Sequence, residues 1–251
     1  MDISLQISNS YIRRARLQPA LFVALPAAIA VLAFSPGGIV GWGLLWSVLV
    51  LCGGTILLAE LGRERGKNRE PELFRSWGGK PSTQLLRHRD NANEVLLSRR
   101  HKKLAALIPG QHLPTVAEES ENPALADKAY DSCVAFLLEK TRDQKAFSLL
   151  FEENCSYGFR RNLWGMKPIG IFISFAAVLA IVSGLAMRVL TPQPLVVICG
   201  CLTLLISLIW ILVIRPTWIK TVAFSYAERL LAACDVLEPP KPEEGRIRLA
   251  E

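Results

Sequence analysis

Two short segments carry the residue types that bind phosphate or transfer a phosphoryl group. Gly78-Gly79-Lys80-Pro81-Ser82 has the glycines and lysine of a phosphate-binding loop, but the motif's first glycine would fall at Phe74 and its Ser or Thr at Pro81. His88-Arg89-Asp90 has the order of a kinase catalytic triplet, but the asparagine expected five residues after the aspartate is Val95. Neither motif is complete. The glycine pair predicts a tight turn instead.

Metal-ligating and nucleophilic side chains also lack the spacing that their chemistry requires. The three histidines do not have metal-ligand spacing, and His101 falls on an apolar helical face, which is typical of a hydrogen-bonded core histidine. The acidic run 118–121 could hold a cation, but its composition favours a solvated loop. No cysteine or hydroxyl has a base at a recognisable spacing. The sequence therefore predicts no catalytic residue, no metal and no cofactor.

A ligand or partner surface is expected where Trp, Tyr, Gly, Arg and Asn are dense, because these residues make specific turns and polar contacts. The alternative is that the same residues form ordered turns that pack on lipid headgroups. The candidate residues are Arg75, Trp77, Lys80, Arg87, His88, Arg89 and Asp90 in one segment, and Asn154, Tyr157, Arg160, Arg161 and Asn162 in another.

Four long apolar runs must position these segments. Each run has roughly 18–22 residues, enough for a helix to cross a hydrocarbon core of about 30 Å. A buried helix of that length in a soluble domain would carry a polar stripe, which these runs lack. Short turns containing Pro and Gly pair the runs into two antiparallel hairpins. The runs are Leu17–Phe34, Gly38–Ala59, Ile169–Leu190 and Leu195–Ile214.

The placement of Lys and Arg predicts the orientation. Basic residues precede the first run, follow the second, precede the third and follow the fourth, whereas Arg188 is the one basic residue near a hairpin loop. By the positive-inside rule, both termini and the central block are cytoplasmic, which predicts a multi-pass protein of the inner membrane. The predicted segments are a cytoplasmic N-tail (1–16), a transmembrane hairpin (17–59), a cytoplasmic helical domain (60–168), a second hairpin (169–214), a cytoplasmic helix (215–238) and a disordered tail (239–251). The fold class is all-α.

The central block is divided by charge. Residues 62–103 hold twelve Lys or Arg against five Asp or Glu, whereas residues 104–154 hold four against nine. The basic part lies next to the predicted membrane and can attract anionic headgroups. Nucleic acid could use the same charge, but the stretch has only two aromatic residues, Phe74 and Trp77, so lipid is favoured over nucleic acid. Control of topology alone is a further explanation.

Capping signals predict the helices of this block. Asp90-Asn91 predicts the start of a helix that runs to about Ile108, Thr115 with Glu118 has capping-box spacing, and Asn122-Pro123 predicts another start. Thr141 is predicted to cap the helix that follows. The fourth run is predicted to continue as one helix to about Leu237, with an apolar face that packs on the block. Apolar positions at helical spacing predict one buried face, comprising Ala126, Ala129, Tyr130, Cys133, Val134 and Leu137.

Small residues at Ala176, Ala180 and Gly184 form a stripe on the third run that lets another helix approach closely. Packing within the chain and assembly into a homo-oligomer both explain this stripe, and both interpretations stay open.

The order of two spans, a block, two spans and a helix resembles the proton-channel stator subunits of bacterial motors. At the same coarse level it resembles small four-span membrane effectors of bacterial antiviral systems. Neither resemblance assigns a residue. The leading hypothesis is a non-enzymatic protein whose cytoplasmic domain binds a partner protein or a signal, and whose spans assemble in or perturb the bilayer, as an antiviral-defence effector does. The alternatives are a channel, transporter or stator-like subunit, and a membrane-bound enzyme with a cytoplasmic site.

Overall fold

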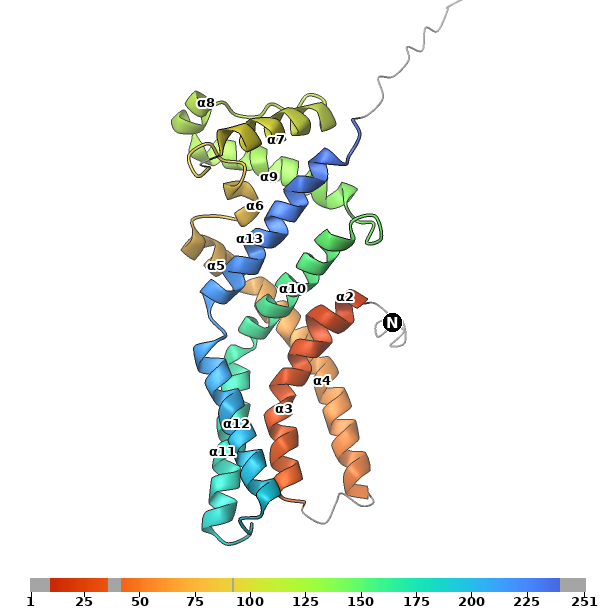
Figure 1. Ribbon diagram of the computed structural model, residues 1–251, viewed down its shortest axis with the longest axis vertical. Coiled ribbons are helices and arrows are strands. Elements are labelled where there is room, and N and C mark those ends of the chain that lie inside the picture. The colour runs from red at the N-terminus through yellow and green to blue at the C-terminus, as the bar shows by residue number, and fades with distance from the viewer. Residues whose placement is uncertain (1–9, 36–41, 92, 240–251) are drawn as a thin grey trace, which may run out of the picture. The chain divides into compact units, whose positions relative to one another are not determined.

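The computed structural model describes residues 10–35, 42–91 and 93–239, and only the helical backbone is described for residues 42–52. The described chain is all-helical, and no strand occurs within it (Figure 1).

The chain divides into two compact units. We call residues 1–76 and 152–223 the apolar unit, and residues 77–151 and 224–251 the polar unit. The predicted segment 60–168 therefore belongs partly to each unit. All three boundaries between the units fall inside helices, namely α5 (Glu70–Trp77), α10 (Ser148–Gly165) and α13 (Pro216–Ala232).

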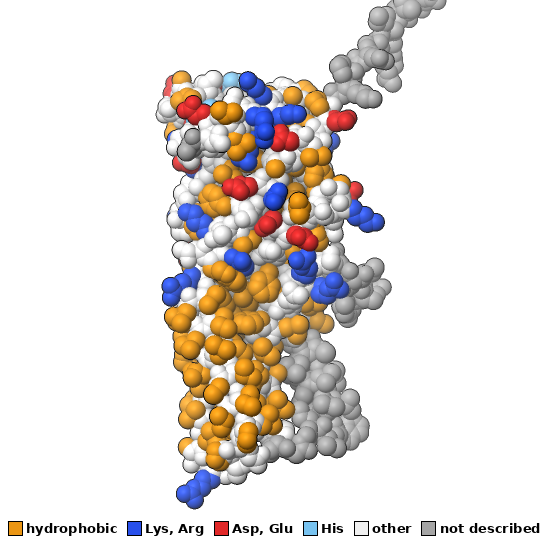
Figure 2. Space-filling model, in the orientation of Figure 1, with side chains coloured by type: hydrophobic (Ala, Val, Ile, Leu, Met, Phe, Trp, Pro, Cys, Tyr) orange, Lys and Arg blue, Asp and Glu red, His pale blue; other side chains and the backbone are white. Residues whose placement is uncertain are grey.

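Three helices of the apolar unit are long and apolar enough to cross a membrane, by length and composition. The first runs from Ser10 to Ala33 through the short α2 (Ser10–Ile12), the π-helix η1 (Arg13–Leu17) and α3 (Gln18–Ala33). The others are α11 (Lys167–Ala186) and α12 (Pro194–Leu212). Large hydrophobic side chains are exposed along them and cover much of the face shown in Figure 2. Because water does not tolerate an apolar surface of this extent, it indicates membrane association.

The second predicted hairpin is present as α11 and α12, which lie side by side (Figure 1). The first is described only in part. Its second run, Gly38–Ala59, corresponds to α4 (Trp42–Asn68), but residues 36–41 and the side chains of residues 42–52 lie outside the described residues. The unit also contains α5 (Glu70–Trp77), except for its last residue.

Helices α3, α11 and α12 pack against one another. Gly170 of α11 lies against the ring of Trp210 on α12, so a larger residue there would clash with a side chain that is fully buried. Phe22 of α3 packs on the same ring, with centroids 5.5 Å apart. The buried face of α11 comprises Gly170, Ser174, Ala177, Ile181 and Gly184.

The predicted small-residue stripe coincides with this buried face at one position only. Gly184 is buried, whereas Ala176 and Ala180 are exposed within the chain. The intrachain contact is made by Ser174 and Ala177 instead, because Trp210 fixes the rotation of α11 through Gly170. Size alone predicts that a face can be approached closely, but it does not select which of two neighbouring faces is used.

The π-helix η1 contains a backbone carbonyl, that of Ala15, whose hydrogen bonding involves a proline and an asparagine far apart in the sequence. Pro19 has no N–H, so the carbonyl of Ala15, four residues earlier, loses its usual helical donor. Asn162 of α10 supplies a replacement: its side-chain nitrogen donates to the Ala15 oxygen at 2.7 Å, and Asn162 is almost fully buried. A break in helical hydrogen bonding next to a proline is thus satisfied by a side chain from another helix.

The polar unit has its own core, to which α7 (Glu94–Leu107), α9 (Pro123–Lys140) and the end of α13 contribute. The predicted face of α9 is confirmed, with Ala129 at its margin, as is the prediction that the C-terminal helix packs on the central block through Leu230. The core comprises Leu86, Leu104, Leu107, Ala126, Tyr130, Cys133, Val134, Leu137, Leu150, Leu230, Leu231 and Cys234. The short α6 (Pro81–Gln84), α8 (Val116–Glu121) and η2 (Ala233–Asp235) complete the unit.

Three helix boundaries differ from prediction. The N-cap of α7 is Asn93, whose side chain accepts from the Leu96 N–H, because Asn91 is used to donate to the Leu85 carbonyl. Thr141 follows the end of α9 and bonds back to that helix instead of starting α10. α12 does not continue into the polar unit: it ends at Leu212 and a separate helix starts at Pro216, because proline cannot supply the next helical N–H.

Candidate ligand-binding pocket

A buried carboxylate organises one end of the polar unit. The side chain of Glu119, on α8, is 3% exposed. It accepts hydrogen bonds from the backbone N–H groups of His88 and Arg89, at 2.8 and 3.1 Å, and from the guanidinium of Arg89, at 2.9 Å. The Tyr130 hydroxyl donates to the same carboxylate at 2.7 Å. Four donors from two other elements thus converge on a single acidic side chain, which is therefore not the solvated residue that the sequence predicts.

Two arginines extend this arrangement to α9. Arg87 holds Asp127 in a two-pronged contact, at 2.8 and 2.6 Å, and also bonds Asp90 at 2.8 Å. Arg89 bonds the same Asp127 at 3.0 Å. Two-pronged pairs of this kind are geometrically specific, so they fix the segment between α6 and α7 in one conformation.

Local chemistry explains why the chain turns here. Gly78 and Gly79 have φ values of +89° and +138°, which L side chains rarely adopt, so the predicted tight turn is confirmed. A Cβ on Gly79 would lie 2.7 Å from the Arg87 guanidinium. α8 begins with the predicted capping box, in which the side chains of Thr115 and Glu118 each bond the other residue's backbone N–H.

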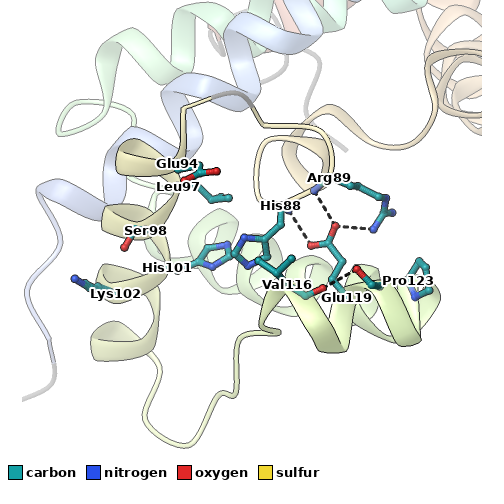
Figure 3. A pocket seen from close by; sticks show the side chains of 11 residues that line it. His88, Arg89, Glu94, Leu97, Ser98, His101, Lys102, Val116, Glu119 and Pro123 are labelled. Atoms are coloured by element: carbon teal, nitrogen blue, oxygen red, sulfur yellow. Dashed lines mark hydrogen bonds and ion pairs between the residues drawn. The ribbon is translucent and has the colours of Figure 1, made fainter.

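Next to this network lies a hollow of about 570 Å³, which we call the histidine pocket (Figure 3). Such a volume is typical of small-molecule sites. Its walls come from α7, from α8, from the first residue of α9 and from the segment that carries His88 and Arg89. The apolar lining is Leu97, Val116 and Pro123, and the polar lining is His88, Arg89, Glu94, Ser98, His101, Lys102, Glu119 and Ser120.

The two histidines of the pocket are held in one tautomer each. His88 Nε2 lies 3.1 Å from the Pro114 carbonyl oxygen, and His101 Nε2 lies 2.9 Å from that of Leu86. A carbonyl can only accept, so in the neutral form of either ring Nε2 carries the hydrogen and Nδ1 is left as an acceptor. The rings contact edge to face, with centroids 5.0 Å apart. Burial lowers the pKa of His101 below its ordinary value of 6.5, which keeps this ring neutral.

The structure gives the predicted site residues different roles. In the polar unit, Arg87, Asp90 and Lys80 are used in internal ion pairs, Lys80 with Asp131, and Trp77 is buried. Only His88 and Arg89 of the predicted set line the histidine pocket.

The second predicted segment belongs to the apolar unit, as does Arg75, which is exposed. Tyr157 and Arg161 of this segment both donate hydrogen bonds to Glu70, at 2.6 and 2.9 Å. Arg160 lies over the ring of Trp218 and donates to its carbonyl, whereas Asn154 is partly exposed on α10. The side chain of Asn162 donates a hydrogen bond to the Ala15 carbonyl. The two segments therefore do not form one site within either unit.

Sequence reasoning missed the acidic partners Glu119 and Asp127, and the α7 residues Glu94, Ser98 and Lys102. The signal for Asp127 was its place one residue after the predicted buried position Ala126, where a charge needs a partner. The α7 residues share the face of His101 or lie beside it, so its helical spacing could have found them.

The described residues offer neither a metal site nor a reactive thiol among Cys133 and Cys234. No group of three or more His, Cys, Asp or Glu side chains within them could hold a metal ion. Burial raises the pKa values of Cys133 and Cys234 to about 11, so both thiols stay protonated and unreactive. Comparison of the chain with protein-family models, with curated proteins and with solved structures finds no match.

The polar unit is expected to lose stability on acidification. Burial alone would raise the pKa of Glu119, but its hydrogen bonds outweigh burial and hold the pKa below 4.5, and bonds from Arg87 and Arg89 do the same for Asp127 below 3.8. The pKa of His101, which faces His88, Tyr130 and Glu119, is also lowered. All three groups favour the deprotonated form in the folded protein. Their contribution is therefore complete above the unfolded-state pKa and is lost as the pH falls through the folded-state pKa.

Thermal unfolding of the detergent-solubilised protein between pH 7.5 and 3.5 checks this. The melting temperature should fall in two stages, below about pH 6.5 for His101 and below about pH 4.5 for the carboxylates. The His101→Gln variant should lack the first stage. A melting temperature that rose on acidification would contradict the assignment.

Proposed function

We propose that the chain is a non-enzymatic, multi-pass protein of a bacterial inner membrane, whose polar unit binds a small molecule in the cytoplasm as a signal. The observation that supports this is the histidine pocket, in which the side chains of Glu94, Ser98 and Lys102, which make no hydrogen bond or ion pair with other described residues, face the same space as apolar side chains. A hollow with convergent polar groups and a histidine of perturbed pKa is a typical small-molecule site. Three helices of the apolar unit are long and apolar enough to cross a membrane, which supports the membrane part of the proposal.

The proposal includes the features predicted from the sequence alone. In the proposed arrangement α4 crosses the membrane in addition to the three apolar helices, which gives four spans, and both termini lie in the cytoplasm. The spans assemble in or perturb the bilayer when the signal binds. Basic residues at the ends of the apolar helices would contact anionic headgroups. Three apolar helices and the charge pattern support this arrangement.

Filling the pocket should abolish ligand binding and leave the fold intact. Ser98 is exposed and lies on α7, so Ser98→Trp places a large ring in the hollow without removing any side-chain hydrogen bond to another described residue. In native mass spectra of protein extracted from its membrane in mild detergent, the wild type should carry a small molecule that Ser98→Trp lacks. The matched control is Ala135→Trp, at an exposed position of α9 outside the pocket lining.

The same spectra report the native mass. An oligomer whose size or bilayer conductance changes when the molecule is removed would support the signalling role. A strict monomer with no effect on conductance would contradict the assembly part, and a wild type that carries nothing in any preparation would contradict the sensing part.

A further inference from the structure

A second hollow adjoins the histidine pocket along α7. It has a volume of about 830 Å³ and shares Glu94, Ser98 and Lys102 with the first. Its remaining lining includes Arg99 and Lys103. We call it the basic groove. Leu97 and His101 face one hollow, whereas Arg99 and Lys103 face the other, so α7 forms the ridge between them.

The two hollows offer different chemistry to one ligand. The histidine pocket has apolar walls and the rings of His88 and His101, whose Nδ1 atoms make no hydrogen bond with other described residues and can accept from a planar group with N–H donors. The basic groove has three cationic side chains against Glu94, which suits an anion. Among the described residues, Lys102 and Lys103 make no side-chain hydrogen bond or ion pair, whereas Arg99 forms an ion pair with Asp235 at 3.0 Å.

The residues at the boundary suit the part of a ligand that joins these groups. Ser98 and Glu94 line both hollows. Glu94 has no ion pair among the described residues, and a carboxylate in such a place can accept from the hydroxyls of a sugar, as acidic side chains do in nucleotide sites.

We infer that the ligand of the polar unit is a mononucleotide, with its base in the histidine pocket, its ribose beside Glu94 and Ser98, and its phosphate on Lys102 and Lys103. This inference rests on the proposed function, since it names the ligand class of the same site. A base with an exocyclic amino group fits best, because only such a base presents two N–H donors on one group to the two imidazole acceptors.

Binding of AMP, GMP, CMP and UMP to the full-length protein in lipid nanodiscs, measured by calorimetry, tests the inference. At least one amino-bearing monophosphate should bind, and its nucleoside and inorganic phosphate should each bind at least about tenfold more weakly. His101→Gln keeps a donor for the Leu86 carbonyl but removes the Nδ1 acceptor, so it should weaken both nucleotide and nucleoside. Lys102→Ala should weaken the nucleotide about five- to tenfold and leave the nucleoside unchanged.

The control is Lys128→Ala, an exposed lysine of α9 that lines neither hollow, which should bind as the wild type does. The inference is overturned if no monophosphate binds, if phosphate alone binds as tightly, or if His101→Gln and Lys102→Ala both leave affinity unchanged. If another small molecule co-purifies and is lost in Ser98→Trp, the nucleotide inference fails and the sensing proposal stands. If nothing binds or co-purifies, both fail.

Discussion

Replacing Glu119 with leucine is expected to unfold the polar unit, lowering its free energy of unfolding by about 3–5 kcal/mol, the loss typical when one partner of a buried charged pair is removed. Leucine has a similar volume but cannot accept the bonds from His88, Arg89 and Tyr130. Two backbone N–H groups and a hydroxyl would lose their acceptor inside the protein, and the guanidinium of Arg89 would keep only Asp127.

Urea unfolding of the detergent-solubilised protein, followed by tryptophan fluorescence, measures this loss. The free energy of unfolding of Glu119→Gln should lie between those of the wild type and Glu119→Leu. The amide oxygen of glutamine can still accept from Arg89, but its NH₂ group faces other donors. Glu121→Leu is the matched control, since Glu121 lies on the same helix, is exposed and makes no ion pair among the described residues. A Glu119→Leu variant as stable as Glu121→Leu would show that the network does not hold the unit together.

The same carboxylate shows where sequence reasoning reached its limit. The capping box of α8 and the buried face of α9 could be predicted because both depend on residues within one helical turn or one helical period. Glu119 lies inside that capping-box helix, but its partners come from 30 residues earlier and 11 residues later. The capping-box spacing identifies Glu118, which is exposed and has its pKa lowered to about 2 chiefly by the Thr115 backbone, but no local pattern indicates that Glu119 is buried.

The apolar helices also have one feature that the sequence could predict and one that it could not. Length and composition predicted four apolar runs, and three helices long and apolar enough to cross a membrane are found among the described residues, because these are properties of one segment. Which face of α11 packs was not predictable, because it depends on Trp210 of another helix. The histidine pocket was missed for a related reason: its lining is assembled from three stretches of chain, and only the His88–Arg89 stretch carried a recognisable cluster.

Removing the side chain of Asn162 should destabilise the apolar unit by about 1–3 kcal/mol, the range for a buried polar group left without its partner. In Asn162→Leu the Ala15 carbonyl has no donor, since residue 19 is a proline. The control is Asn154→Leu, two turns earlier on α10, where the side chain is partly exposed. Thermal unfolding in detergent at fixed lipid content compares the two.

Pro19→Ala provides the decisive second change, because alanine restores an N–H four residues after Ala15. If Asn162 is present to satisfy the carbonyl that Pro19 leaves free, then Asn162→Leu should cost less than half as much in the Pro19→Ala background as in the wild type. The two residues would then show a coupling energy on the order of 1 kcal/mol in a double-mutant cycle. Additive losses would mean that Asn162 acts through packing alone, and the π-helix at residues 13–17 would need another cause. The coupled result would assign this segment's geometry to one missing N–H and one side chain 143 residues away, a pairing that no local pattern could reveal.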